Sequence, residues 1–331
     1  MTSKKKTILA IAIFVLLLGA VILTQRDPYE KKTDSEIPKV PELDKATVDK
    51  VEIVNTTEAL TFNKKNNKWF VTSNNGKEYK TEETFEVMVL DKLKKIKIER
   101  IVSEKKSKHS NFKVDEKGTR VRVYANGKKL LSLIVGKNTP DYRGTFFRFP
   151  DSNTVYASSG IIGGSLKRSL RDWRYKKLMD ISRVDVEKIT FHVEKKKSFS
   201  LLLTPAPVKP DAKEGEAGED AKWKLEGNDK VEIDQSKVTS LLNLVTSMVW
   251  SEAIDEPKDL KEYGLNSPKY WIELTTKDKK KIKLNLGKTI EDKHMAFVNI
   301  EGKKGVFKVH KYQYDRLLNK LEHYKKAKKS K

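Results

Sequence analysis

Few residues in this sequence have the types and the spacing that chemistry on a substrate requires. The triplet Gly287-Lys288-Thr289 matches the end of a phosphate-binding P-loop, in which backbone amides cradle the phosphate and the lysine reaches it. That motif also requires a glycine five residues before its Gly-Lys pair, and Ile282 stands there. A Gly-Lys pair also occurs at 136–137, again after alternating apolar residues. Both pairs are therefore predicted to lie at strand ends.

Nucleophilic and metal-based chemistry has no better support. Ser165 follows the glycines of the stretch 158–170 and is predicted to be a helix N-cap, and no G-x-S-x-G pattern exposes a nucleophilic serine. The chain has no cysteine, and its histidines form neither an H-E-x-x-H motif nor a pair at i, i+4. The histidines are His109, His192, His294, His310 and His323. We predict a protein that is not an enzyme, with no catalytic, cofactor-binding or metal-binding residues.

The elements that would position a site recur in two halves of the chain. Shifting the sequence by 151 residues superimposes apolar positions over about sixty residues. The match runs from Phe112, which meets Tyr263, to Leu170, which meets Leu321. The two Gly-Lys pairs coincide under the same shift. The sequence therefore contains two copies of one structural unit.

Each copy is predicted to form an antiparallel sheet with helices on one side. Apolar residues alternate with Lys, Arg, Thr and Glu, which is typical of strands that bury one face, and the turns at 124–129 and 275–281 favour hairpins. Trp69 and Trp223 occupy the same place in the two copies, which predicts core packing. The predicted fold class is α+β, with an N-terminal transmembrane helix followed by two tandem repeats.

The N-terminal segment predicts a membrane anchor. Residues 7–24 carry no charge, and a helix of this length spans roughly 27 Å, close to the hydrocarbon thickness of a bilayer. A cleaved signal peptide is the alternative, but no small-x-small site follows the run. Lysines at 4–6 precede it, so the positive-inside rule predicts a single-pass protein of the inner (cytoplasmic) membrane. Its N-terminus would be cytoplasmic and its bulk periplasmic.

The net charge of +23 at pH 7 predicts attraction to polyanions. An extracytoplasmic domain seldom meets nucleic acid, so we expect no nucleic-acid partner, and anionic envelope polymers or lipid headgroups are the local candidates. Most basic residues are lysines, whereas bidentate recognition of phosphate favours arginine. A solvated lysine surface with no dedicated ligand is therefore the alternative interpretation.

The segment 170–181 joins the two copies and has the least core-like composition. It contains the candidate partner-docking residues Arg171, Asp172, Trp173 and Arg174. Arg and Trp are favoured anchors in protein interfaces, which supports a docking surface. The alternative is a salt-bridged junction that connects the two copies.

Composition and the repeat together predict the domain boundaries. Residues 1–24 form the cytoplasmic lysines and the anchor, 25–44 a stalk, 45–182 repeat unit 1, 183–323 repeat unit 2, and 324–331 a basic tail. Residues 204–222 are rich in Pro, Gly, Glu and Lys and interrupt the second copy between two strands. They are predicted to be a disordered hairpin insertion.

Several motifs together resemble a bacterial family known as domain of unknown function 4340. These are the opening I-x-F/V…W-x-V/L of each copy, the Y-G-L-x-x-P turn at 263–268, the strand ending L-G-K, and L-R-D before K-L-M-D-I. The resemblance covers residues 45–323, and copy one departs from it at 112–117, where Phe-Lys-Val and a lysine replace Tyr-Gly-Leu and the proline. The family supplies no catalytic residues.

The resemblance implies a membrane-anchored envelope protein, as members of that family are, and many members are encoded beside ABC exporters of the gliding-motility type. The leading hypothesis is therefore an extracytoplasmic scaffold or accessory subunit of such a transport complex. The second hypothesis is a protein that binds anionic envelope polymer or lipid through its lysines. An enzyme is the third, and it would require a cleft in which titratable side chains converge.

Overall fold

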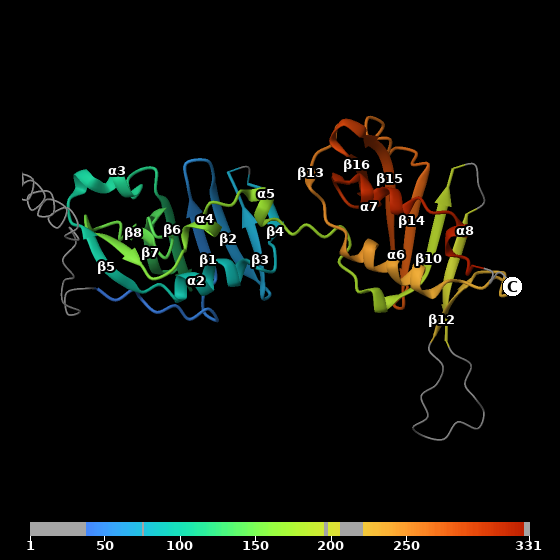
Figure 1. Ribbon diagram of the computed structural model, residues 1–331, viewed down its shortest axis with the longest axis horizontal. Coiled ribbons are helices and arrows are strands. Elements are labelled where there is room, and N and C mark those ends of the chain that lie inside the picture. Colours follow the sequence, from blue (N-terminus) through green and yellow to red (C-terminus); the bar gives the residue numbers. More distant parts are fainter. Residues whose placement is uncertain (1–37, 75, 195–197, 206–220, 328–331) are drawn as a thin grey trace, which may run out of the picture. The chain divides into compact units, whose positions relative to one another are not determined.

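The computed structural model in Figure 1 describes residues 38–327, apart from residue 75, residues 195–197 and residues 206–220. The chain divides into two compact units, Met1–Tyr175 and Lys176–Lys331, called unit 1 and unit 2 below. The predicted anchor at 7–24, most of the predicted stalk and most of the predicted insertion lie outside the described residues. Within the described part of the chain, no helix is both long and apolar enough to cross a membrane.

Unit 1 is built on one antiparallel sheet. In the described residues its strand order is β4-β3-β2-β1-β6-β7-β8-β9-β5. The strands are β1 (Lys50–Val54), β2 (Ala59–Lys65), β3 (Lys68–Thr72), β4 (Glu78–Lys80), β5 (Ile98–Ser103), β6 (Thr119–Ala125), β7 (Lys128–Asn138), β8 (Thr145–Arg148) and β9 (Val155–Ser158). The turn between β6 and β7 has positive φ at Asn126 and Gly127, as expected for a tight hairpin.

The helices of unit 1 are short. They are a π-helical turn (Glu86–Leu90) that continues into α2 (Asp91–Lys94), a 3-10 turn (Lys106–Lys108) followed by α3 (His109–Phe112), α4 (Gly163–Leu166) and α5 (Leu170–Trp173). Apolar residues of the π-helical turn, α2, α4 and α5 join those of the sheet in one core, in which Trp69 is 7% exposed. A smaller apolar cluster that includes Val114 and Phe146 forms where α3 lies.

Unit 2 repeats this architecture. Its strand order in the described residues is β12-β11-β10-β14-β15-β16-β17-β13, again antiparallel throughout. The strands are β10 (Val186–Val193), β11 (Phe199–Thr204), β12 (Lys222–Leu225), β13 (Glu252–Ile254), β14 (Tyr270–Thr276), β15 (Lys281–Ile290), β16 (Met295–Ile300) and β17 (Val306–His310). Thr204 of β11 pairs with Lys222 of β12, so the two strands meet directly on either side of residues 206–220.

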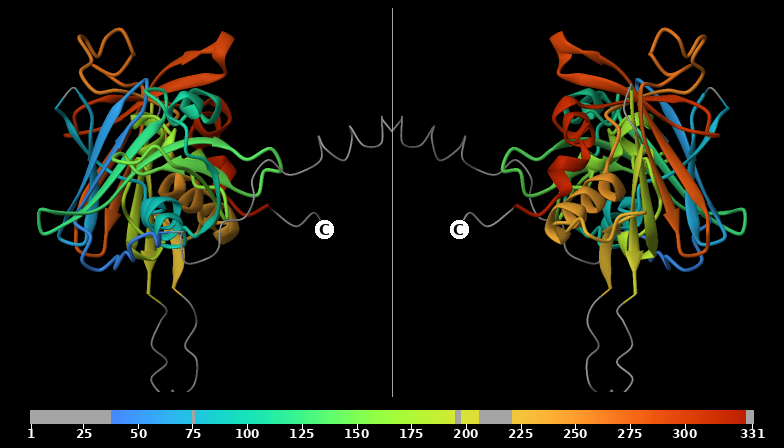
Figure 2. Two further views of the ribbon diagram at one scale, coloured as in Figure 1. Left: turned by 90° about the vertical axis from the view of Figure 1, so that its left-hand side faces the viewer. Right: turned by 90° about the vertical axis from the view of Figure 1, so that its right-hand side faces the viewer.

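The helices of unit 2 lie on one side of its sheet, as both views in Figure 2 show. They are α6 (Gln235–Ser247), α7 (Lys311–Leu317) and α8 (Leu321–Tyr324), with 3-10 turns at Arg183–Asp185 and Glu291–Lys293. Apolar side chains from all three helices and the sheet form one core, in which Trp223 is 8% exposed. Trp69 and Trp223 thus pack equivalently in the two cores.

The repeated glycines Gly136 and Gly287 allow a close crossing of two chain segments. A Cβ atom on Gly136 would lie 2.1 Å from the carbonyl oxygen of Phe112, and one on Gly287 would lie 2.3 Å from that of Tyr263. In unit 2 the crossing is also hydrogen-bonded, because the Lys288 amide donates to the Tyr263 carbonyl at 2.8 Å. The Gly-Lys pairs therefore serve backbone packing and do not form a phosphate loop.

The turn that makes this crossing has the same conformation in both units despite different residues. The backbone φ is +56° at Lys113 and +71° at Gly264, which correspond under the 151-residue shift. Two aromatic pairs accompany the turns, Phe112–Phe146 with ring centroids 4.9 Å apart and Tyr263–Phe297 with centroids 5.0 Å apart. Copy one therefore departs from the family pattern in sequence and keeps its shape.

Three residues lie in places that differ from the sequence analysis. Ser165 is not an N-cap, because it lies within α4 and its hydroxyl donates to the carbonyl of Met88 at 2.7 Å. Leu43 was assigned to the stalk, but it is 2% exposed in the unit 1 core. Tyr324 was assigned to the basic tail, but it is 1% exposed in the unit 2 core.

Candidate functional site

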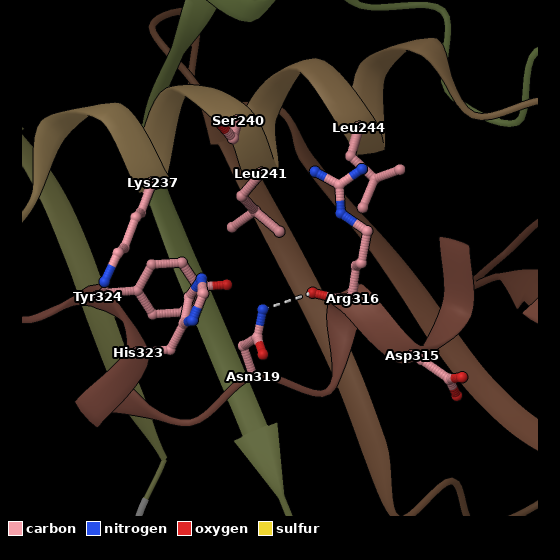
Figure 3. Close-up of a pocket in the computed structure, with 9 residues that line it drawn as sticks. All are labelled: Lys237, Ser240, Leu241, Leu244, Asp315, Arg316, Asn319, His323 and Tyr324. Atoms are coloured by element: carbon pink, nitrogen blue, oxygen red, sulfur yellow. Dashed lines mark hydrogen bonds between the residues drawn. The ribbon is translucent and has the colours of Figure 1, made fainter. Parts of the chain in front are cut away.

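A cleft in unit 2 lies between α6 and the segment α7–α8 and has a volume of about 490 Å³ (Figure 3). Volumes of this size are typical of sites for small organic ligands. The lining residues are Lys237, Ser240, Leu241, Leu244, Asp315, Arg316, Asn319, His323 and Tyr324. The cleft brings together side chains that are more than seventy residues apart in the sequence.

One wall of the cleft is a single face of α6. Asp234 caps the helix, since its carboxylate accepts hydrogen bonds from the amides of Ser236 and Lys237. Lining residues then follow at helical spacing, from Lys237 to Leu244. Leu241 is 4% exposed and forms an apolar floor, while the lysine stands at the rim.

The opposite wall is held by backbone hydrogen bonds. The amide of Asp234 donates to the carbonyl of Tyr324 at 2.8 Å, and the amide of Lys326 donates to the carbonyl of Glu232 at 3.0 Å. Unit 1 has the same pair of bonds under the repeat, because the Glu82 amide donates to the Trp173 carbonyl and the Tyr175 amide donates to the Lys80 carbonyl, both at 2.8 Å. These bonds fix α8 against the start of α6, so the walls of the cleft are backbone-supported.

Tyr324 carries a buried hydroxyl group at the cleft. Its oxygen is inaccessible to solvent and has no hydrogen-bond partner among the described residues. Burial raises the pKa of Tyr324 well above its ordinary value, and the neighbouring Asn319 side chain opposes this effect. Figure 3 shows the Tyr324 side chain extending towards Asn319 and Leu241. The hydroxyl is therefore enclosed behind the cleft lining, as the Trp173 Nε1 is at the equivalent place in unit 1, and it is not open to a ligand in the cleft.

Cationic side chains dominate the charge of the cleft. Arg316 is exposed and makes no ion pair within the described part of the chain. Lys237 lies 3.9 Å from a carboxylate oxygen of Asp234, which is a long and partly exposed pair. The remaining carboxylate, Asp315, is paired with Lys311 at 2.8 Å, and Figure 3 shows it pointing away from the other lining residues.

His323 adds a titratable group beside these cations. Partial burial is the main cause that lowers the pKa of His323 below its ordinary value, Lys237 lowers it further, and Asp234 opposes the shift. Its ring meets that of Tyr324 edge-on, with centroids 5.0 Å apart. A bound anion would favour the charged imidazolium, so His323 can couple binding to pH.

The corresponding place in unit 1 is filled by side chains. Trp173 takes the place of Tyr324 under the 151-residue shift, and Arg168 takes that of Asn319. The guanidinium carbon of Arg168 lies 5.0 Å from the centroid of the Trp173 ring, and the group donates to the sulfur of Met88 at 3.1 Å. Arg168 and Met88 thus cover the ring that corresponds to Tyr324.

The helices of the two units are aligned by a shift of 152 residues, which superimposes buried Leu90 on buried Leu242. Under this shift Met88 corresponds to Ser240, a much smaller side chain. Replacing a long side chain with a short one at each side of the ring is what leaves the cleft open in unit 2.

The predicted docking residues do not form a joint surface in unit 1. Trp173 is fully buried and packs edge-on against Phe62 and Phe85, with ring centroids 5.6 Å and 5.5 Å away. Asp172 forms a capping box with the N-cap residue of α5. The guanidinium carbon of Arg174 lies 3.9 Å from the centroid of the Tyr79 ring. Of the four residues only Arg171 is mainly exposed. Because Trp173 is buried in the core, it offers no anchor to a partner.

No short sequence motif marks His323 and its neighbours as a site. Their convergence depends on the packing of α6 against α7 and α8, which residue spacing does not encode. The other histidines lie elsewhere; for example, His109 is 5% exposed and its Nε2 contacts the carbonyl oxygen of Asn153 at 2.8 Å. In the residues with described positions, no group of three or more His, Asp or Glu could hold a metal ion.

A family model described as Domain of unknown function (DUF4340) matches residues 87–221 and 223–328. The chain belongs to the DUF4340 family. The two DUF4340 matches meet within the β11–β12 hairpin, whereas the structural units divide between Tyr175 and Lys176. No curated protein and no solved structure matches the chain.

Proposed function

We propose that this DUF4340 protein is a non-enzymatic interaction and scaffold protein on the extracytoplasmic side of the cytoplasmic membrane. In this proposal residues 7–24 anchor the chain in the bilayer, and both units stand outside the cytoplasm. The partner is a membrane complex, and the family resemblance favours an ABC transporter of the gliding-motility type. Unit 2 supplies the contact surface.

The observation that supports this proposal is the difference between two equivalent places. In unit 1 Arg168 and Met88 fill the space beside the Trp173 ring, whereas in unit 2 a cleft lies beside Tyr324, which is itself 1% exposed. Because side chains fill this space in unit 1, the fold does not require an open cleft at the equivalent position of unit 2. The open cleft with unpaired Arg316 therefore favours a binding role for unit 2.

Photo-crosslinking in cells tests the proposal. A photo-reactive amino acid in place of Ser240, which is exposed on α6, should form adducts with integral membrane proteins. A matched control places the same group at Asn126, on the exposed β6–β7 turn of unit 1, and should not form them. The proposal fails if the Ser240 position yields no membrane-protein adduct, or if both positions yield the same adducts.

A second candidate function is binding of anionic envelope polymer or lipid through the lysine-rich surface. The net charge of +23 favours it, since exposed lysines attract polyanions over a distance set by salt. Binding of a soluble anionic polysaccharide should fall steeply as NaCl rises from about 0.01 M to about 0.15 M, because the Debye length shortens from about 30 Å to about 8 Å. Salt-independent binding, or none, would reject it.

A further inference from the structure

We propose that the unit 2 cleft binds an amphiphilic organic anion, namely a carboxylate or a phosphate monoester carried on a short alkyl stem. This inference deepens the proposed function and rests on it, because it gives the ligand chemistry of the same cleft. Three features carry it: the unpaired cation at the rim, the apolar floor, and the side chains that occupy the same place in unit 1.

The charged end of the ligand is recognised by Arg316. A guanidinium presents two N–H groups in the geometry that a carboxylate or phosphate accepts, and Arg316 has no ion-pair partner among the described residues. Lys237 adds positive charge to the same cleft, and a bound anion would favour the protonated form of His323. Asp315, the one acidic lining residue, is engaged by Lys311 and does not oppose an anion directly.

The stem of the ligand is recognised by the floor. Leu241 and Leu244 are 4% and 8% exposed and present methyl groups to the cleft, and the Tyr324 ring continues this surface.

In unit 1 a side chain of the protein occupies the place that the ligand would take in unit 2. The Arg168 side chain, an alkyl stem that ends in a charge, lies across the Trp173 ring. In unit 2 the surroundings carry more positive charge, because Arg316 replaces the neutral Ser165 and the titratable His323 replaces the acidic Asp172 under the 151-residue shift. The complementary guest in unit 2 is therefore a stem that ends in a negative charge.

Calorimetric titration of the full chain in nanodiscs of zwitterionic lipid tests the proposal with four probes. Hexyl phosphate and hexanoate carry both the stem and the charge, 1-hexanol carries only the stem, and inorganic phosphate carries only the charge. Both amphiphilic anions should bind, and each single-feature probe should bind at least tenfold more weakly. Comparison of the two anions shows whether a phosphate monoester or a carboxylate is the better guest.

Two variants locate the site. Arg316→Ser installs the unit 1 residue and should weaken hexyl phosphate binding by about tenfold or more, as expected for loss of a charged hydrogen bond. Ser240→Met installs the unit 1 methionine and should abolish binding by filling the cleft. Arg171→Ser is the matched control, since it removes another exposed arginine and should leave affinity unchanged. Unchanged melting temperatures would show that the variants are folded.

The proposal is overturned if 1-hexanol binds as tightly as hexyl phosphate, if Ser240→Met retains binding, or if Arg171→Ser weakens binding as much as Arg316→Ser. It is also overturned if no amphiphilic anion binds. Failure here is distinguishable from failure of the proposed function. Crosslinks from Ser240 without anion binding reject only the ligand, and anion binding without crosslinks rejects only the membrane-complex partner.

Discussion

Units 1 and 2 are alike where backbone groups pack closely or form hydrogen bonds. They differ where the C-terminal helices of each unit, α4–α5 in unit 1 and α7–α8 in unit 2, face an earlier helix, which is the π-helical turn with α2 in unit 1 and α6 in unit 2. The agreement includes the order of eight strands, to which unit 1 adds β4 at one edge, the glycines Gly136 and Gly287, and the hydrogen bonds that hold α5 and α8. The difference is a few side chains, chiefly Arg168 against Asn319 and Met88 against Ser240.

This contrast separates residues that the fold requires from residues that it leaves free. A glycine beside a carbonyl oxygen or an aromatic ring in the core has few substitutes, so it recurs as the same type of residue. Side chains at the rim of the cleft have no such constraint, because the fold forms with the place filled or open. Function can therefore differ between the units without a change of architecture.

The largest effect is expected when the equivalent aromatic residues are removed. Trp173→Ala should lower the free energy of unfolding of unit 1 by about 3–5 kcal/mol, because it deletes a fully buried ring that packs against Phe62 and Phe85. Tyr324→Ala should destabilise unit 2 in the same way, by less, because its hydroxyl has no partner among the described residues. Hydrogen exchange against urea, resolved by peptide, measures each unit. Equal loss in both units from one substitution would contradict the equivalence.

The next largest effect concerns the repeated glycines. Gly136→Ala and Gly287→Ala should each cost about 2 kcal/mol or more, since the new methyl group would lie within 2.3 Å of a carbonyl oxygen. Gly127→Ala is the matched control, because its φ is +75° but no atom lies within 4 Å of the new methyl group. It should cost only about 1 kcal/mol. Urea denaturation compares them, and costs at Gly136 and Gly287 no greater than that at Gly127 would show that the close crossing does not explain the repeat.

These residues also show which parts of the structure the sequence could predict. The alternating strands, the hairpin at 124–129 and the paired tryptophans Trp69 and Trp223 were predictable, because each leaves a local pattern or a repeated residue type. The equivalence of Trp173 and Tyr324 was missed, since the two residues differ and a one-turn helix does not reveal which side faces the core. Trp173 was interpreted as a surface anchor for that reason.

The cleft was not predictable from the sequence. Its residues come from α6, α7 and α8, and no short motif links Lys237 with Arg316 or His323. The signal that could have found it is the shift of 151 residues itself, applied to positions that differ between the copies. At Ser165 and Asp172 that shift exchanges a neutral and an acidic residue for Arg316 and His323.

A smaller effect is expected when the closed place in unit 1 is opened. Arg168→Ala removes a cation from the Trp173 ring and should cost unit 1 about 1 kcal/mol in its free energy of unfolding. Asn319→Arg is the reciprocal change and should block the unit 2 cleft with no such loss. Thermal denaturation and hexyl phosphate titration measure the two outcomes. If Asn319→Arg leaves hexyl phosphate binding intact, the inference that Arg168 fills in unit 1 the space that is the cleft in unit 2 is wrong.

The turn before β6 should respond more weakly. Lys113→Gly places in unit 1 the residue that unit 2 has at Gly264, and should stabilise unit 1 by about 0.5–1 kcal/mol, because φ at Lys113 is +56°. Lys117→Gly, four residues later, is the control and should not stabilise. Urea denaturation distinguishes them, and a destabilised Lys113→Gly variant would mean that the lysine side chain holds the turn.

The smallest expected effect is a pH dependence confined to unit 2. Since the pKa of His323 is lowered in the folded protein, the unfolded chain binds the proton more readily, and unit 2 should lose stability as pH falls below about 6.5. Lys237 and Asp234 of α6 are the charged groups that act on it. His323→Gln should flatten the dependence of the melting temperature on pH between about 5 and 8. A steeper dependence in the variant would contradict the direction of the shift.

The central claim is that one sheet-and-helix unit occurs twice and is open to a ligand only in unit 2. Hydrogen–deuterium exchange of the full chain with and without hexyl phosphate tests it most directly. We predict slower exchange in α6 and in residues 311–326, and no change in the corresponding residues 86–94 and 163–175 of unit 1. Protection in unit 1, or equal protection in both units, would contradict the account.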